Sequence, residues 1–79
     1  MAPDFLIEPR SSTDNLATLQ KKMQEYQDNG VRLGWLINPH DQEIEVYRIG
    51  RSSEVIQSPM SLSGEDILPG FILDLTTIW

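Results

Sequence analysis

The stretch from Asp4 to Ile37 constrains the fold most, because two short apolar runs flank a polar loop and an amphipathic segment. Residues 4–8, Asp-Phe-Leu-Ile-Glu, are apolar with polar ends and predict a short strand, which Pro9 is expected to end. Residues 31–37 are largely apolar and predict a second strand that is covered on both faces. A helical connection between two such strands makes them parallel, and crossovers of this kind are right-handed.

The segment between these strands predicts an amphipathic helix. Its apolar side chains recur at spacings of three and four and form one stripe, which consists of Leu16, Leu19, Met23 and Tyr26. Thr13 or Asp14 is expected to cap the start of the helix, and Gly30 suits the left-handed position after its end. The helix is therefore expected to cover one face of the sheet.

The residues after Ile37 predict an antiparallel β-meander. Ile44 and Val46 alternate with Glu43 and Glu45, which predicts a half-exposed strand in a hairpin with the strand before it. Residues 54–57 predict a third strand of the meander.

The tail of the chain carries weaker signals. Residues 69–70, Pro-Gly, indicate a turn, residues 72–75 a short strand, and residues 75–79 a terminal helical turn. No segment is predicted to cover the first strand on the side away from the helix. That strand is therefore expected to be an exposed edge, or to pair between two copies of the chain.

The predicted fold class is α/β (α+β), with a strand–helix–strand crossover followed by the meander. The chain has 79 residues, so we expect one domain, residues 1–79. A core of this size rarely supplies more than about 3–5 kcal/mol, and the chain has no cysteine for disulfides. Self-association into a homo-oligomer is the expected compensation.

Charge and hydropathy exclude several classes of function. The net charge of −6 counts against tight non-specific DNA binding by this chain alone, although it is compatible with metal-assisted chemistry on DNA. No apolar stretch approaches the roughly 20 residues that span a bilayer. The N-terminal residues do not resemble a signal peptide, so a cytoplasmic protein without membrane contact is expected.

Two carboxylates of the first strand are candidates for a metal site. Asp4 and Glu8 point to the same side of a strand, but their α-carbons are roughly 13 Å apart. One Mg²⁺ ion with ligands at about 2.1 Å does not reach both, so a second carboxylate near Glu8 must come from another strand. The alternative is that both residues are solvated ends of the strand.

Lys22 is the candidate cation of such a site. It lies nearer the flank of the apolar stripe than the neighbouring lysine does, so it can lean towards the sheet and polarise a water or pair with a phosphate. The alternative is a surface pair with Glu25. Arg10 follows Glu8 by two residues and is expected either on the same face or in the loop. His40, without a second histidine, is expected to be a solvated turn residue.

Several motifs occur in a characteristic order along the whole chain. They are Pro3-Asp4-Phe5-Leu6-Ile7-Glu8, then Ser11, then Lys22-x-x-x-Tyr26-x-x-x-Gly30-Val31, then Gly34-Trp35-Leu36-Ile37-Asn38-Pro39, then Val46-Tyr47-Arg48, and finally Leu62-Ser63-Gly64 through Leu68-Pro69-Gly70-Phe71. In these motifs the chain resembles the Uma-type (Uma-two) family of restriction endonucleases, which is abundant in cyanobacteria.

The resemblance implies a restriction-endonuclease-like, PD-(D/E)XK nuclease fold and Mg²⁺-dependent hydrolysis of DNA phosphodiesters. In that family pattern Glu8 is the strand carboxylate that binds the metal, and Lys22 is a displaced form of the motif's lysine. Asp4 belongs to the proline–aspartate pair at the start of the strand; it is expected to complete the catalytic set, and the alternative is a structural role.

Three departures from the family pattern modify this expectation. Family members are longer, and the chain matches only their C-terminal half, without the strand that carries the first metal-binding aspartate. Pro9 stands where the family has an apolar residue, and Ser12 stands where a proline is common. We therefore expect a truncated nuclease that is inactive alone and needs a complementing N-terminal half or a second copy. The alternative is a non-catalytic α/β interaction module or remnant.

Overall fold

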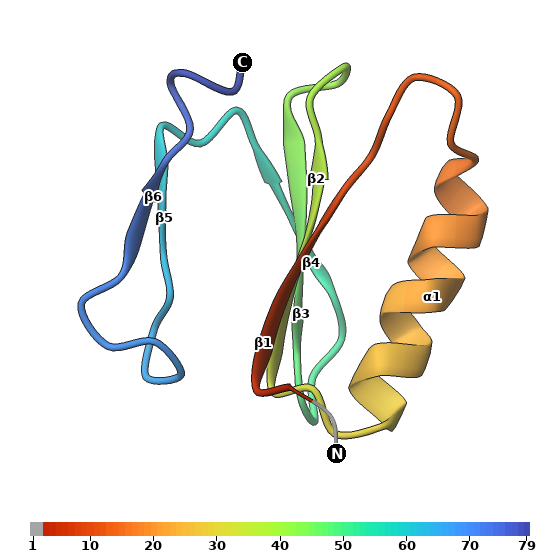
Figure 1. The fold of residues 1–79 in the computed structure, drawn as a ribbon, viewed down its shortest axis with the longest axis vertical. Coiled ribbons are helices and arrows are strands. Elements are labelled where there is room, and N and C mark those ends of the chain that lie inside the picture. The colour runs from red at the N-terminus through yellow and green to blue at the C-terminus, as the bar shows by residue number, and fades with distance from the viewer. Residues whose placement is uncertain (1–2) are drawn as a thin grey trace.

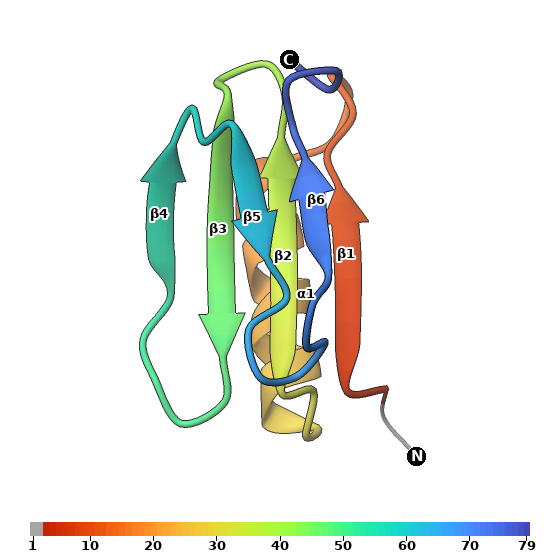
Figure 2. The same cartoon turned by 90° about the vertical axis from the view of Figure 1, so that its left-hand side faces the viewer.

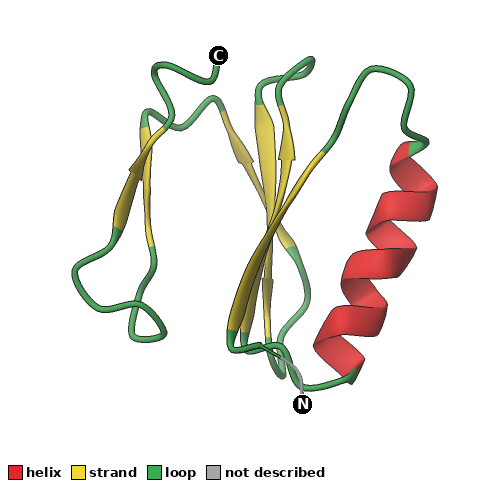
Figure 3. Cartoon of the chain, in the orientation of Figure 1, coloured by secondary structure: helices red, strands yellow, loops and turns green. Residues whose placement is uncertain are grey.

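The computed structural model describes residues 3–79 as three layers, with a helix on one side of a four-stranded sheet and a two-stranded sheet on the other (Figure 1). The elements are β1 (Phe5–Pro9), α1 (Leu16–Asp28), β2 (Leu33–Asn38), β3 (Glu43–Arg48), β4 (Glu54–Gln57), β5 (Ser61–Ser63) and β6 (Ile72–Asp74). Figure 3 shows how loops join them. No helix among these residues is long and apolar enough to cross a bilayer.

The predicted crossover and meander are confirmed. The larger sheet has the order β1-β2-β3-β4, in which β1 and β2 are parallel and the other neighbours are antiparallel. Every residue of β2 is buried, as expected for a strand covered on both faces. In the register of the sheet, Glu8 lies beside Leu36, and Leu36 lies beside Glu45.

Pro9 does not end the first strand, which corrects the prediction. The backbone N–H of Leu33 donates to the Asp4 carbonyl at 3.1 Å, and that of Arg10 donates to the Ile37 carbonyl at 2.9 Å. A strand bonds a parallel neighbour through alternate residues, here the even-numbered ones from Asp4 to Arg10. Pro9 belongs to the other set, so the position where it lacks an N–H faces the open edge. Among the described residues β1 pairs only with β2, which confirms that it is an edge strand and explains why proline is tolerated.

The N-cap of the helix lies after the two predicted residues, Thr13 and Asp14. Asn15 is its N-cap, and the Asn15 side chain accepts a hydrogen bond from the Thr18 N–H at 3.1 Å. Thr13 and Asp14 do not cap the helix, because the Asp14 carboxylate accepts the N–H and hydroxyl of Ser11 instead. The helix ends as predicted, since Gly30 has a φ of +99°, a conformation that favours glycine.

The helix packs closely on the sheet. Leu19 and Met23 of α1 are buried against Leu36 and Tyr47. A Cβ atom at Gly34 would stand 2.8 Å from Met23 Cε, so the missing side chain allows the helix to approach β2.

The face away from the helix is covered within the chain, which corrects the expectation that it is not. Figure 2 shows β5 and β6 in front of the larger sheet. The buried cluster between these layers contains Leu33, Trp35, Ile37, Ile44, Val46, Leu62 and Leu75. Phe5 of β1 packs edge-on against Trp35, with ring centroids 4.9 Å apart, and also contacts Phe71. The pattern Ser-Leu-Ser in β5 is too short and polar to predict a strand.

The last residues form a hydrogen-bonded turn, in which the Trp79 N–H donates to the Leu75 carbonyl at 3.2 Å. The Trp79 indole N–H donates to the Pro59 carbonyl at 2.8 Å, so the chain end is fastened to the segment before β5. These contacts hold the covering layer against the sheet.

Candidate active site

Glu8 and Lys22 are brought together by the packing of α1 on β1. Lys22 Nζ lies 3.4 Å from Glu8 Oε1, although the two residues are 14 positions apart in the chain. The side chains are 23% exposed for Glu8 and 46% exposed for Lys22, so the pair is accessible to a substrate. The structure therefore places Lys22 towards the sheet, and Glu8 is its ion-pair partner.

The surroundings of Lys22 stabilise its charged form. A hydrogen bond with Tyr26 raises the pKa of the Lys22 ammonium above its ordinary value, and the charge of Glu8 raises it further. The ammonium also lies 5.8 Å from the centroid of the Tyr26 ring. A lysine that stays protonated acts as a donor to negative charge and not as a base, so it suits the stabilisation of a phosphate.

Asp4 does not join this pair. It precedes β1, and its carboxylate lies 4.0 Å from the Arg32 guanidinium with the side chain 71% exposed. Asp4 contributes to the fold through its backbone, because its carbonyl accepts hydrogen bonds from the N–H groups of Arg32 and Leu33. Of the three predicted catalytic residues, the structure therefore brings together Glu8 and Lys22.

The described residues do not by themselves form a metal site. No group of three or more histidine, aspartate or glutamate side chains within residues 3–79 is arranged to hold an ion. Mg²⁺ takes near-octahedral oxygen coordination, and Glu8 supplies one carboxylate at this position. Glu45 faces the same side of the sheet but lies two strands away, at about 10 Å between backbones, so the two carboxylates do not share an ion.

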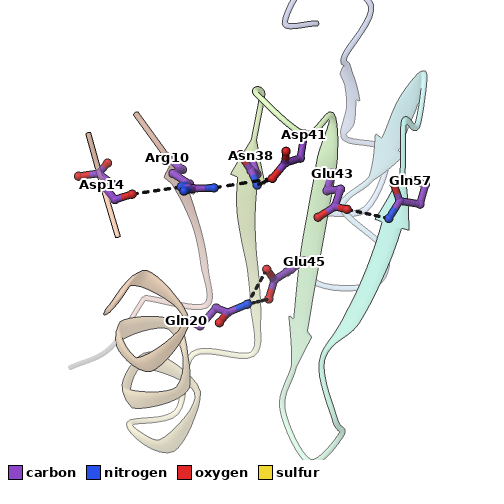
Figure 4. A network of polar contacts seen from close by, with 8 residues as sticks. All are labelled: Arg10, Asp14, Gln20, Asn38, Asp41, Glu43, Glu45 and Gln57. Carbon is purple, nitrogen blue, oxygen red and sulfur yellow. Dashed lines mark hydrogen bonds and ion pairs between the residues drawn. The ribbon is translucent and has the colours of Figure 1, made fainter. Parts of the chain in front are cut away.

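Glu45 belongs to a polar cluster that sequence analysis missed. It is 6% exposed, whereas the alternating pattern of β3 predicted a solvent-facing side chain. The Gln20 amide donates to both of its carboxylate oxygens, at 3.1 and 3.0 Å (Figure 4). The Tyr47 hydroxyl donates to one of these oxygens at 3.1 Å. Burial, followed by the charge of Glu45, raises the pKa of Tyr47 well above its ordinary value. Alternation identifies the two faces of a strand, but it does not reveal that a helix covers Glu45.

Two polar contacts fix the two flanks of the helix on the sheet. Gln20 holds one flank of α1 over β3, and Lys22 holds the other flank over β1. Because Glu8, Leu36 and Glu45 lie in one row across the sheet, the two contacts act at the same level and restrict rotation of the helix about its axis.

A second group of polar residues lies where β1 and β2 end. Arg10 does not take part in the ion pair of Glu8, since its Nε donates to the Asp14 carbonyl at 3.3 Å and its Nη1 lies 3.8 Å from Asp41 Oδ2 (Figure 4). Hydrogen bonds from Ser11 lower the pKa of the Asp14 carboxyl. His40 is exposed in the turn after β2, as predicted.

A family model with the description "Putative restriction endonuclease", Uma2, matches residues 1–76. This chain belongs to the Uma2 family. The Uma2 chain is also similar to the crystal structure of a protein from Anabaena variabilis that is described as a putative nuclease belonging to DUF820. The two are 28% identical with a TM-score of 0.81.

The match to that structure covers 95% of the Uma2 chain but 42% of the other protein, so the chain spans less than half of its length. No curated protein matches the chain. The family resemblance and the fold class inferred from the sequence are thus confirmed, and the Uma2 chain is a nuclease-like domain.

Proposed function

We propose that this Uma2 chain contributes Glu8 and Lys22 to the site of a metal-dependent DNA endonuclease, and that further carboxylates come from a segment outside residues 3–79. The observation that supports this proposal is the accessible ion pair of 3.4 Å between a strand carboxylate and a protonated helix lysine. The family description and the name of the Anabaena variabilis protein point to the same class of reaction.

The two side chains suit different tasks in phosphodiester hydrolysis. The Lys22 ammonium is a fixed positive charge that stabilises the negative charge developing on the phosphate oxygens, or polarises the attacking water. The Glu8 carboxylate is a hard oxygen ligand for a divalent cation, and the family resemblance implies Mg²⁺. Because residues 3–79 offer one such ligand here, we assign no metal-dependent step to this chain alone.

The open edge of β1 is where we expect the missing ligands to enter. The alternation of hydrogen bonds leaves the peptide groups of Phe5 and Ile7 facing outwards, and Pro9 offers a carbonyl but no N–H. A strand added there lies about 4.8 Å from β1 and places alternate side chains beside Glu8. This segment belongs to another part of a longer chain, to a neighbouring polypeptide or to a second copy, and we propose that residues 3–79 do not cleave DNA without it.

A non-catalytic interaction module is the second candidate. It is favoured by the same lack of a metal-binding group among the described residues. In that case the edge of β1 still binds a partner strand, but Glu8 and Lys22 are an ordinary surface ion pair.

Cleavage of plasmid DNA separates the two candidates. We expect Mg²⁺-dependent nicking when the chain is combined with a complementing segment, complete loss in Glu8→Ala, and a loss of about 10²–10³-fold in Lys22→Ala. Glu54→Ala and Lys21→Ala are matched controls, because each removes the same kind of charge elsewhere, and both should cleave normally. Cleavage that persists in Glu8→Ala would remove Glu8 from the mechanism, and inactivity with every complement would favour the interaction module.

A further inference from the structure

A cavity of about 390 Å³ opens beside the candidate active site, at the ends of β1 and β2. It is lined by Arg10, Ser11, Ser12, Asn38, Pro39 and His40. These residues follow the carboxyl ends of two parallel strands, which is where ligands bind in open α/β sheets. Arg10 follows Glu8 by two residues, so the cavity and the ion pair are neighbours along one strand.

Arg10 supplies an oriented positive charge to this cavity. Its Nε is fixed by the Asp14 carbonyl at 3.3 Å, whereas its contact with Asp41 is 3.8 Å long and that carboxylate is 48% exposed. Long ion pairs with exposed partners contribute little, so an anion can compete for the guanidinium. A guanidinium with free N–H groups in a fixed plane binds phosphate oxygens well.

Asn38 gives an independent indication of a ligand. It is 2% exposed, and its Nδ2 donates to Asp41 Oδ2 at 2.8 Å, which fixes the orientation of the amide because a carboxylate only accepts. Its Oδ1 is buried and accepts no hydrogen bond from residues 3–79. Two consequences follow. Asp41 stays bound to Asn38 when Arg10 turns to an anion, and the free Asn38 acceptor suits a water molecule of the hydration shell of the anion.

Ser12 and His40 extend the set of donors around the opening. Both are exposed, and each offers a hydroxyl or ring N–H next to Arg10. Together they favour an anion with several oxygens over a simple carboxylate. The chain as a whole has a net charge of −6. The attraction between an anion and Arg10 is therefore local and is not part of an extended basic surface.

We propose that this cavity binds a backbone phosphate of the nucleic-acid strand whose neighbouring phosphodiester lies at Glu8 and Lys22. The inference rests on the proposed nuclease function for its substrate class. The spacing is compatible with it, since Glu8 and Arg10 lie about 6.6 Å apart along the chain, and a nucleic-acid strand advances about 3.4 Å per nucleotide along the duplex axis. The cavity thus holds the strand one or two nucleotides from the reacting position and sets its register.

Metal-free binding measurements test this assignment without any cleavage. The chain is titrated with a short DNA duplex, and the amide signals of Ser12, Asn38 and His40 are followed by NMR together with the Arg10 side chain. We expect these signals to move, and we expect Arg10→Gln to weaken duplex binding about tenfold at low salt and to reduce the salt slope by about 0.9. Arg51→Gln is the matched control, because it removes the same charge from the turn after β3, at the opposite end of the sheet.

Several outcomes decide the proposal. Arg10→Lys keeps the charge but loses the planar fork, so it should bind with intermediate affinity; it also serves if Arg10→Gln does not fold. Equal weakening by Arg10→Gln and Arg51→Gln would overturn the site, as would unchanged binding in both. Binding of inorganic phosphate at these signals without binding of duplex would overturn the nucleic-acid assignment. A lack of cleavage with every complement affects only the proposed nuclease function, because binding is measured without metal.

Discussion

The two flanks of helix α1 touch the sheet in contrasting ways. On the β1 side, Lys22 meets Glu8 in an ion pair that is open to solvent. On the β3 side, Gln20 meets the buried carboxylate of Glu45, which Tyr47 also contacts. Both contacts reach the same row of the sheet, so their sheet partners differ in burial and not in position along the strands.

This contrast separates stability from chemistry. An exposed ion pair gains little free energy, because water and salt screen it and two long side chains lose freedom. A buried carboxylate without hydrogen bonds is costly, so its donors are needed to keep the fold. We infer that the Gln20 contact orients the helix, and that this leaves Lys22 and Glu8 free to serve a substrate.

The largest effect is expected on the buried flank. Gln20→Leu removes the two hydrogen bonds from the Glu45 carboxylate and leaves it buried, so the free energy of unfolding should fall by about 1–3 kcal/mol in urea titrations. Gln24→Leu is the control, because the Gln24 amide bonds only neighbouring side chains on the same helix. Combining Gln20→Leu with Glu45→Leu should recover part of the loss, because no buried carboxylate is then left without donors, while the Tyr47 hydroxyl loses its acceptor. Equal destabilisation in the two single variants would contradict the comparison.

A smaller effect is expected from Tyr47 at alkaline pH. Burial and the Glu45 charge raise the pKa of Tyr47 in the folded state, whereas the unfolded chain releases this proton near the ordinary value of 10.0. Between these two values the folded state holds more protons, so stability should fall as the pH rises above 10. Tyr47→Phe removes this contribution, and its stability should decline less steeply from pH 9 to pH 11. If the free energy of unfolding depended on pH equally in Tyr47→Phe and the parent chain, the Tyr47 hydroxyl would not be buried beside Glu45 as the structure indicates.

The smallest effect on stability is expected on the exposed flank. Glu8→Gln and Lys22→Met should leave the midpoint of unfolding close to that of the parent chain, at both low and high salt. Any contribution from the raised pKa of Lys22 is present below pH 10.5 and disappears as the pH rises through the folded value. A loss as large as that of Gln20→Leu would make the ion pair structural and would weaken the case for an active site.

The main elements of the fold could be predicted from local pattern. The apolar stripe of α1, the apolar run of β2 and the alternation in β3 each report a periodicity that neighbouring residues set, and the length of the crossover makes β1 and β2 parallel. Lys22 could be placed on the flank nearest the sheet for the same reason. The family motifs then predicted a shared site for Glu8 and Lys22, and the structure places the two side chains in contact.

Only the tertiary structure determined which side chains are buried and which elements cover them. The burial of Glu45 depends on a helix that begins 29 residues earlier, and the cover over Trp35 depends on short strands near the end of the chain. Pro9 stays in β1 because only its outward side lacks a neighbour, which is a property of the sheet and not of the residue. Periodicity fixes which way side chains point along one element. Which atoms they meet depends on elements that approach from elsewhere in the chain, and a free energy of packing shared among many contacts selects that arrangement.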